Sequence, residues 1–142
     1  MLTERWGAPE IITCGRIHQA DQLPGFVAIL GEEKIGLVTY HVENKAYEIV
    51  SLDSLVEKTG IGSGLIAAVQ DEVHRAGCHR LWLITMNDNL PALGFYQKRG
   101  FYLVAVHVNA LELSRSLKPT IPLIGLEGIP LRDEIDLEMT LD

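Results

Sequence analysis

The sequence lacks an apolar run that could cross a bilayer, and it shows no targeting segment. A membrane-spanning helix needs ~20 predominantly apolar residues in a row, and no stretch of this chain approaches that length. The first residues, Met1 to Trp6, do not follow the basic-then-apolar layout of a signal peptide. We therefore expect a soluble cytoplasmic protein with no membrane partner.

Cysteine is scarce, and clustered basic residues are missing. Cys14 and Cys78 lie far apart without metal-ligand spacing, so we interpret them as buried thiols and expect no metal site. The 12 Lys and Arg residues are outnumbered by 19 Asp and Glu, which gives a net charge of −7 at pH 7. This balance argues against a nucleic-acid partner. It is compatible with a cationic substrate such as an amine.

What is present suits one domain over residues 1–142, because 47% of the residues are hydrophobic and can bury a sizeable core. After a loose lead-in over residues 1–9, the first half alternates apolar runs with turn residues. It predicts four strands, over Ile11–His18, Phe26–Leu30, Ile35–Val42 and Ala46–Leu52. The last three are expected to form an antiparallel meander, since short turns join them.

The second half predicts helices between strands. A helix from Ile61 to Ala76 ends at Gly77, and the apolar strand Leu81–Thr85 should lie parallel to Ala46–Leu52 because a helix connects them. The next element is expected to be a helix that Asn89 caps and that ends before Gly100, followed by a strand Tyr102–Val108. The remaining elements are expected to be a short helix Asn109–Leu117, a long loop Lys118–Leu131 and a half-exposed strand Asp133–Leu141. This order indicates a mixed α/β fold.

The most informative stretch is Gly60-Ile61-Gly62-Ser63-Gly64, which opens the first helix. Backbone N–H groups of a glycine-rich helix start can point at phosphate oxygens, and the helix dipole favours negative charge there. On these residues alone, the stretch is either an anion site or a plain connection between a strand and a helix.

Two segments resemble the GNAT superfamily of acyl-CoA-dependent N-acetyltransferases. Leu52 to Leu65 resembles the family's pyrophosphate loop, whose pattern is Gln or Arg, two residues, Gly, one residue, then Gly or Ala. Asn89 to Phe101 resembles the family's helix with Asn, two residues, Ala, two residues, Phe-Tyr, two residues, Gly-Phe. The resemblance covers roughly residues 26–106, followed by a C-terminal loop and strand over 107–142.

This resemblance implies a GNAT-like mixed sheet whose two central parallel strands splay around acetyl-CoA. In such a fold, the backbone of Leu52 and Ser54 pairs with the pantetheine amides and Asn89 touches the same arm; Asn89 is alternatively only a helix cap. The amides around Lys58 to Gly64 would hold the pyrophosphate. The expected binding residues of this loop are Lys58, Thr59, Gly60, Gly62, Ser63 and Gly64.

The resemblance also implies direct attack by a primary amine of a small molecule or a peptide. Tyr96 would lie near the thioester and protonate the leaving thiolate; its alternative is a core tyrosine. Glu48 is our first candidate for the general base, on a strand face shared with Val50 and Leu52. The alternative for Glu48 is a solvated strand position. Asp53 and His41 are the second and third choices for the base.

Two departures from the family pattern matter. Glu57 occupies the Gln or Arg position of the loop, and we expect Lys58 to supply the missing positive charge.

Only about 25 residues precede the first firmly predicted strand, which leaves no room for the two helices that usually roof the acceptor site. We hypothesise that Asn109–Leu131 replaces this roof, with Arg115, Lys118 and Arg132 binding an acidic group. A homodimer contact is the rival role for this segment.

Three classes of function remain open at this point. The first is acetyl transfer to an amine, and the second is a non-catalytic acyl-CoA-binding or regulatory module on the same fold. The third is a nucleotide- or phosphate-binding protein on an unrelated α/β fold, in which the segment from Asn89 to Phe101 would have no role.

Overall fold

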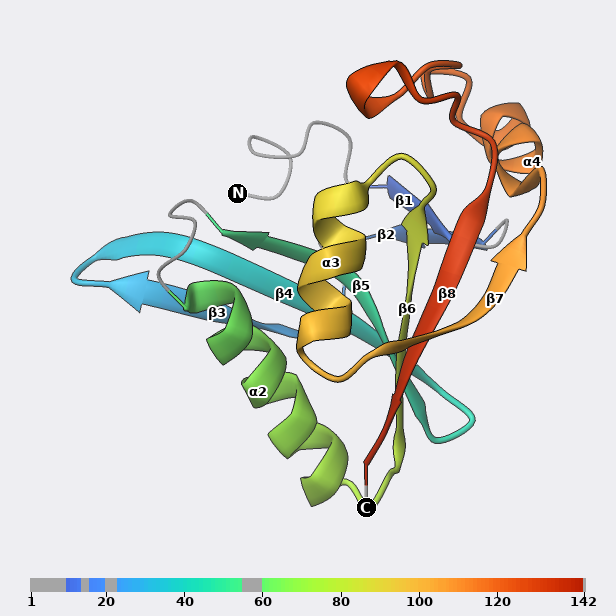
Figure 1. Ribbon diagram of the computed structural model, residues 1–142. Coiled ribbons are helices and arrows are strands. Elements are labelled where there is room, and N and C mark those ends of the chain that lie inside the picture. The colour runs from blue at the N-terminus through green and yellow to red at the C-terminus, as the bar shows by residue number, and fades with distance from the viewer. Residues whose placement is uncertain (1–9, 14–15, 20–22, 55–59, 142) are drawn as a thin grey trace.

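The computed structural model describes residues 10–13, 16–19, 23–54 and 60–141, and Figure 1 shows their arrangement. A six-stranded sheet in the order β3-β4-β5-β6-β8-β7 is central. Its strands are β3 (Gly25–Leu30), β4 (Glu33–Glu43), β5 (Ala46–Ser54), β6 (Arg80–Met86), β8 (Glu134–Thr140) and β7 (Tyr102–His107). Helices α2 (Ile61–Arg75) and α3 (Leu90–Lys98) pack on one face of this sheet. The predicted mixed α/β fold is confirmed.

The antiparallel meander β3-β4-β5 is also confirmed. The turn between β4 and β5 contains Asn44 and Lys45 with φ of 52° and 62°. Positive φ at both central residues belongs to the tight hairpin turn whose twist matches the strands that it joins. The sequence placed both turns of the meander correctly.

The prediction of one strand over Ile11–His18 is wrong. The structure has two short strands there, β1 (Glu10–Thr13) and β2 (Arg16–Gln19), which pair with each other from Glu10↔Gln19 to Thr13↔Arg16. They form a separate two-stranded sheet. The chain therefore reverses within the segment, a reversal that the mixed apolar and polar pattern did not reveal.

The two central strands β5 and β6 are parallel, as predicted, but they pair over a short distance. Their ladder runs from Ala46↔Arg80 to Ile49↔Leu83 and includes no later residue of either described strand. Beyond it, β5 continues beside β4 as far as Ser54, and β6 continues beside β8 as far as Met86. The two strands thus part in the middle of the sheet.

The main core lies between the sheet and the two helices. Helix α2 contributes its apolar stripe, Leu65, Ile66, Val69 and Val73, all at most 4% exposed. The helix begins after Gly60 (φ 81°), and the chain leaves it through Gly77 (φ 72°), as predicted. None of the helices in the described ranges is long and apolar enough to span a membrane.

Strand β8 is more buried than the expected half-exposed strand. Ile135, Leu137 and Met139 reach the core, and Glu134 on the other face is only 3% exposed. The reason is topological: β8 lies between β6 and β7 rather than at an edge. Alternation along one strand predicts which residues share a face, but it does not show whether neighbouring elements cover the other face.

The segment between β7 and β8 contains α4 (Ala110–Leu117), as predicted, and a short turn of helix, η2 (Leu126–Gly128), within the expected loop. Hydrogen bonds hold this segment against the turn between β6 and α3. The Asn87 amide donates to the carbonyl of Pro130 and accepts from the backbone N–H groups of Arg132 and Asp133. The buried Asp88 carboxylate accepts from the N–H of Leu126 at 2.8 Å. Figure 1 shows this segment beside the N-terminal end of α3.

Candidate active site

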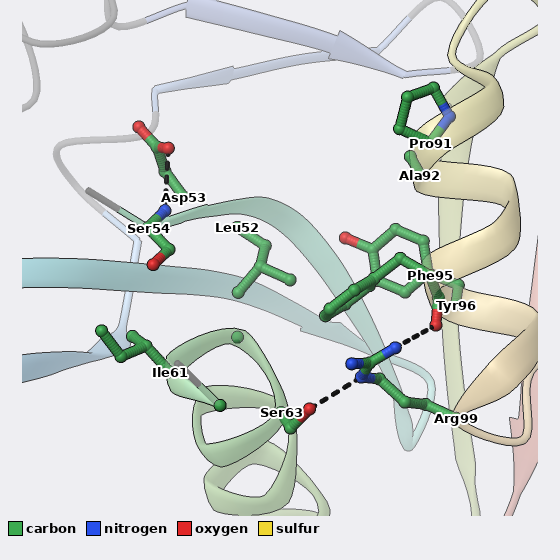
Figure 2. A pocket seen from close by; sticks show the side chains of 12 residues that line it. Leu52, Asp53, Ser54, Ile61, Ser63, Pro91, Ala92, Phe95, Tyr96 and Arg99 are labelled. Carbon is green, nitrogen blue, oxygen red and sulfur yellow. Dashed lines mark hydrogen bonds between the residues drawn. The ribbon is translucent and has the colours of Figure 1, made fainter. Parts of the chain in front are cut away.

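A cavity of about 420 Å³ lies between the end of β5, the start of α2 and one side of α3 (Figure 2). It collects residues from three segments that are far apart in the sequence. The lining residues are Leu52, Asp53, Ser54, Gly60, Ile61, Gly62, Ser63, Pro91, Ala92, Phe95, Tyr96 and Arg99. Six of the predicted binding residues therefore come together: Leu52, Ser54, Gly60, Gly62, Ser63 and Tyr96.

The glycine-rich start of α2 forms one wall. Gly60 is the N-cap and no side chain caps the helix, so the first turn presents backbone N–H groups near the cavity. A Cβ at Gly62 would lie 2.9 Å from Cζ of Phe95, whereas a Cβ at Gly64 would meet nothing within 4 Å. Gly62 is thus a packing requirement, and Gly64 is not among the residues that line the cavity. Glu57, Lys58 and Thr59 lie outside the described residues.

Asn89 has a structural role at the start of α3. Its side-chain oxygen accepts the backbone N–H of Ala92 at 3.2 Å, which is the geometry of an N-cap. The cap interpretation is confirmed, and Asn89 does not line the cavity. Its contact with a cofactor stays a prediction.

Tyr96 belongs both to the core and to the cavity. Its ring is 9% exposed and packs edge-on against Phe95 and Phe101, with ring centroids 5.3 and 5.4 Å apart. Figure 2 shows its hydroxyl directed from α3 toward Leu52. Burial raises the pKa of Tyr96 to about 12, because the phenolate would lose its hydration. The hydroxyl therefore stays protonated at neutral pH and can donate a proton.

Arg99 was not among the predicted site residues, yet it bridges α3 and α2. Its Nε donates to Oγ of Ser63 at 2.8 Å and its Nη1 donates to the carbonyl of Phe95 at 2.8 Å. The guanidinium carbon lies 3.6 Å from the centroid of the Phe95 ring. Arg99 is the one basic side chain among the described lining residues. The sequence places Arg99 directly before Gly100 of the second motif, but the motif does not specify the residue type at that position.

Glu48 does not share a face with Leu52, so this part of the prediction is wrong. The β4–β5 register shifts from Thr39↔Ser51 to Tyr40↔Ile49, which leaves Val50 as an extra residue in a β-bulge. One extra residue reverses the alternation beyond it. Leu52 and Ile49 accordingly pack toward the helices, while Glu48 lies on the opposite face at 1% exposure.

The other two candidates for the base lie on either side of the bulge. His41 pairs with Glu48 in the register and so lies on the same face. Asp53 lines the cavity, and its Oδ1 accepts the backbone N–H of Ser54 at 2.8 Å. The residue after Glu48 is Ile49, which forms with Leu83 the last pair of the β5–β6 ladder. Beyond this pair the two central strands part. Of the three, Glu48 combines burial with closeness to the opening.

Two of the three proposed acid-binding residues, Arg115 and Arg132, bind within the C-terminal segment instead. Arg115 donates to the carbonyls of Pro122 and Leu131. Arg132 donates to Asp133 at 2.8 Å and thereby lowers the pKa of the Asp133 carboxyl. Both cations stabilise the fold of the segment, so the hypothesis that they bind an acidic substrate group loses its support.

Comparison with protein families gives one clear match. Residues 2–101 match the model of the acetyltransferase (GNAT) family. The uncharacterised protein YdhI of Bacillus subtilis is 44% identical over 147 residues, which cover 100% of this chain and 92% of YdhI. A second uncharacterised B. subtilis protein, YxbD, is 41% identical over 93% of this chain and 84% of its own length.

Solved structures show the same fold. An IAA acetyltransferase from Bacillus cereus superposes with a TM-score of 0.73 at 26% identity, over 86% of this chain and 80% of that protein. A B. subtilis acetyltransferase in complex with CoA has a TM-score of 0.72 at 23% identity, over 86% and 79%. A GNAT-family acetyltransferase from Elizabethkingia anophelis with acetyl-CoA bound has a TM-score of 0.71 at 24% identity, over 81% and 74%.

The two glycines of the first turn of α2 should respond oppositely to alanine. Gly64→Ala adds a methyl group in open space and removes backbone entropy from the unfolded chain, so the free energy of unfolding should rise by ~0.5–1 kcal/mol. Gly62→Ala forces the Phe95 ring to shift and should lower it by ~1–3 kcal/mol. Urea denaturation of the three proteins measures both values. Equal stability of the two variants would contradict the packing described here.

Proposed function

Since this chain belongs to the acetyltransferase (GNAT) family, we propose that it transfers an acetyl group from acetyl-CoA to a primary amine of a small molecule or a peptide. The observation that carries the proposal is the cavity at the parting of β5 and β6, bordered by a glycine-rich helix start and by Tyr96. The CoA and acetyl-CoA bound to two of the similar structures support it.

The cofactor would lie along this cavity with its pyrophosphate at the start of α2. Backbone N–H groups from Gly60 to Ser63 suit phosphate oxygens, and the Arg99 guanidinium adds positive charge beside Ser63. We assign Lys58, Thr59 and Gly64 to the same loop on the strength of the motif. Arg99 supplies the positive charge that Glu57, at the Gln or Arg position of the motif, does not supply.

The pantetheine arm would enter the gap between the central strands. We assign its amide contacts to the backbone of Leu52 and Ser54, because both residues line the cavity at the end of β5. Asn89 caps α3 and so holds the helix that carries Tyr96. This arrangement brings the thioester beside the Tyr96 hydroxyl.

The reaction would be a direct transfer. Glu48 accepts, through water, the proton that the ammonium group loses, and the neutral amine nitrogen then bonds to the carbonyl carbon of the thioester. Tyr96 protonates the sulfur as the C–S bond breaks. The second proton of the amine returns to Tyr96 through solvent, which leaves an amide and a free thiol.

A non-catalytic acyl-CoA-binding module is the alternative. It would need the cavity but not a proton donor aimed at the thioester. The buried, protonated hydroxyl of Tyr96 at the cavity wall favours catalysis.

Binding of acetyl-CoA tests the central proposal, and a substitution at Arg99 tests whether its positive charge contributes to that binding. Isothermal calorimetry should detect acetyl-CoA binding, and Arg99→Met should weaken it ~10-fold or more through loss of a charge-assisted contact. Arg75→Met, at the far end of α2 with a 74% exposed side chain, is the matched control and should bind normally. An unmodified protein that does not bind acetyl-CoA would overturn the proposal.

Tyr96→Phe should separate catalysis from binding. Loss of the proton donor should lower kcat by ~10²–10⁴-fold, while the dissociation constant for acetyl-CoA changes little. Because the raised pKa of about 12 keeps Tyr96 protonated, the kcat of the unmodified enzyme should show no loss from Tyr96 deprotonation between pH 7 and ~10. Release of free thiol measures the rate. Retention of full kcat in the variant would remove Tyr96 from the mechanism.

We also propose a homodimer formed through strand β7. This strand ends the sheet, and Figure 1 shows it beside α4. Leu103, Val104 and Val106 are about half exposed, on both faces because of a bulge between Leu103 and Ala105. No Lys, Glu or Pro blunts β7, and such an edge readily pairs with a copy of itself across a two-fold axis.

A lysine on each edge of the sheet tests the homodimer. Val106→Lys should convert a two-chain species into a single chain, because a charge on β7 opposes close strand pairing. Val27→Lys on β3, the opposite edge, is the control and should leave the mass unchanged. Light scattering after size exclusion measures the mass. A single-chain mass for the unmodified protein would refute the dimer.

A further inference from the structure

Asp88 is a buried acidic residue in the turn between β6 and α3. It is 7% exposed, and it is not among the described residues that line the cavity beside Tyr96. Taking a carboxylate out of water is costly unless hydrogen bonds compensate for the lost hydration. Its Oδ2 accepts the backbone N–H of Leu126 at 2.8 Å. This buried carboxylate therefore joins the start of α3 to the loop over residues 121–131, which we call the η2 loop.

The η2 loop is shaped around this carboxylate. A Cβ at Gly125 would lie 2.7 Å from Cγ of Asp88 and 2.8 Å from Cγ of Leu131, so glycine leaves the space that the carboxylate occupies. The loop is also closed by its own backbone. The N–H of Gly125 donates to the carbonyl of Ile129 at 2.8 Å, and the N–H of Leu131 donates to that of Leu123 at 2.9 Å. A loop that is hydrogen-bonded in this way can hold the residue that it contacts.

Hydrogen bonds continue from the η2 loop into the first turn of α3. The N–H of Leu90, the first residue of the helix, donates to the carbonyl of Asp88 at 2.9 Å. In the same turn, the backbone N–H of Asn87 donates to the carbonyl of Asp133 at 3.0 Å, and the Asn87 side chain donates to that of Pro130 at 2.9 Å. The start of α3 is thus attached to the segment between β7 and β8 through two neighbouring residues.

Helix α3 transmits this attachment to Tyr96. Because Tyr96 follows Leu90 by fewer than two helical turns, or ~9 Å, a shift of the first turn moves its hydroxyl. The other end of α3 is held separately, since Arg99 donates to Oγ of Ser63 on α2 at 2.8 Å. A misplacement of ~1 Å in a reacting group can slow a reaction ~10²-fold. The hold on the first turn can therefore decide how well the Tyr96 hydroxyl meets the thioester.

We propose that Asp88 is a positioning residue for the reaction. Together with Gly125, it fixes the η2 loop against the start of α3 and so sets the place of the Tyr96 hydroxyl. The inference rests on the proposed acetyl transfer and adds to it a residue that acts through Tyr96. It also gives the segment between β7 and β8 a role in the reaction, because this segment holds the helix that carries the proton donor.

A double-mutant cycle with Tyr96 tests the inference. Asp88→Ala removes the acceptor of the Leu126 N–H and should lower kcat ~10-fold or more. Gly125→Ala should act in the same direction, because its methyl group displaces the carboxylate. Asp88→Asn keeps an acceptor oxygen and should recover most of the lost kcat. In the Tyr96→Phe background, Asp88→Ala should change kcat less than ~2-fold, since both substitutions act on one step.

Two further comparisons separate positioning from a general loss of stability. The dissociation constant for acetyl-CoA should change less than ~3-fold in Asp88→Ala, because the proposed phosphate contacts belong to the start of α2 and to the far end of α3. Glu127→Gln, which removes an exposed charge in the same loop, is the matched control and should keep full kcat. An equal loss of kcat from Asp88→Ala with and without the Tyr96 hydroxyl would overturn the inference.

Hydrogen exchange provides a readout that does not depend on turnover. The amides of α3 should exchange ~10-fold faster in Asp88→Ala and in Gly125→Ala, whereas those of α2 should not change. Unchanged exchange in α3 would overturn the inference and leave acetyl transfer standing. Absence of turnover in the unmodified protein despite bound acetyl-CoA would count against the proposed transfer, and the exchange of α3 would still decide whether the η2 loop holds this helix.

Discussion

The parting of β5 and β6 is the constraint on which the site depends. Each strand is held along its other edge, β5 by β4 and β6 by β8, so the two can separate without losing their places in the sheet. The bulge at Val50 coincides with the end of their shared ladder. A bulge strengthens local twist and bends its strand. The cavity that Tyr96 lines lies at this opening on the side of the helices, and a second cavity, lined by Glu48 and Trp82 among others, lies on the opposite sheet face.

The bulge also divides the electrostatics of the molecule. On the helix side, the first turn of α2 and Arg99 offer N–H groups and positive charge to an anionic ligand. On the other face, the carboxylates of Glu48 and Glu43 line the second cavity. The net charge of −7 fits this division, because the cationic part of the site is small and local.

The sequence predicted much of this arrangement, and the failures have physical reasons. Strand periodicity, turn glycines and the two motifs located the meander, α2, α3 and six lining residues, since these signals are local. The bulge at Val50 depends on how two strands pair, so strict alternation put Glu48 on the wrong face. Arg99 entered the site because α3 packs across α2, and Arg115 turned inward to carbonyls that its own segment supplies. Tertiary contacts of this kind leave no periodic trace in a sequence.

The insertion of β8 between β6 and β7 has a consequence for biosynthesis. Strand β7 has no other neighbour in the sheet, and β6 has only four residue pairs with β5. While residues 134–140 are still inside the ribosome, β7 has nowhere to dock and the outer edge of β6 is bare. Helix α2 and the meander can assemble early from contacts close in sequence, whereas the other half of the sheet must wait. A nascent chain held at that stage would display two apolar strands at once, and unpaired strands of this kind are the ones that aggregate.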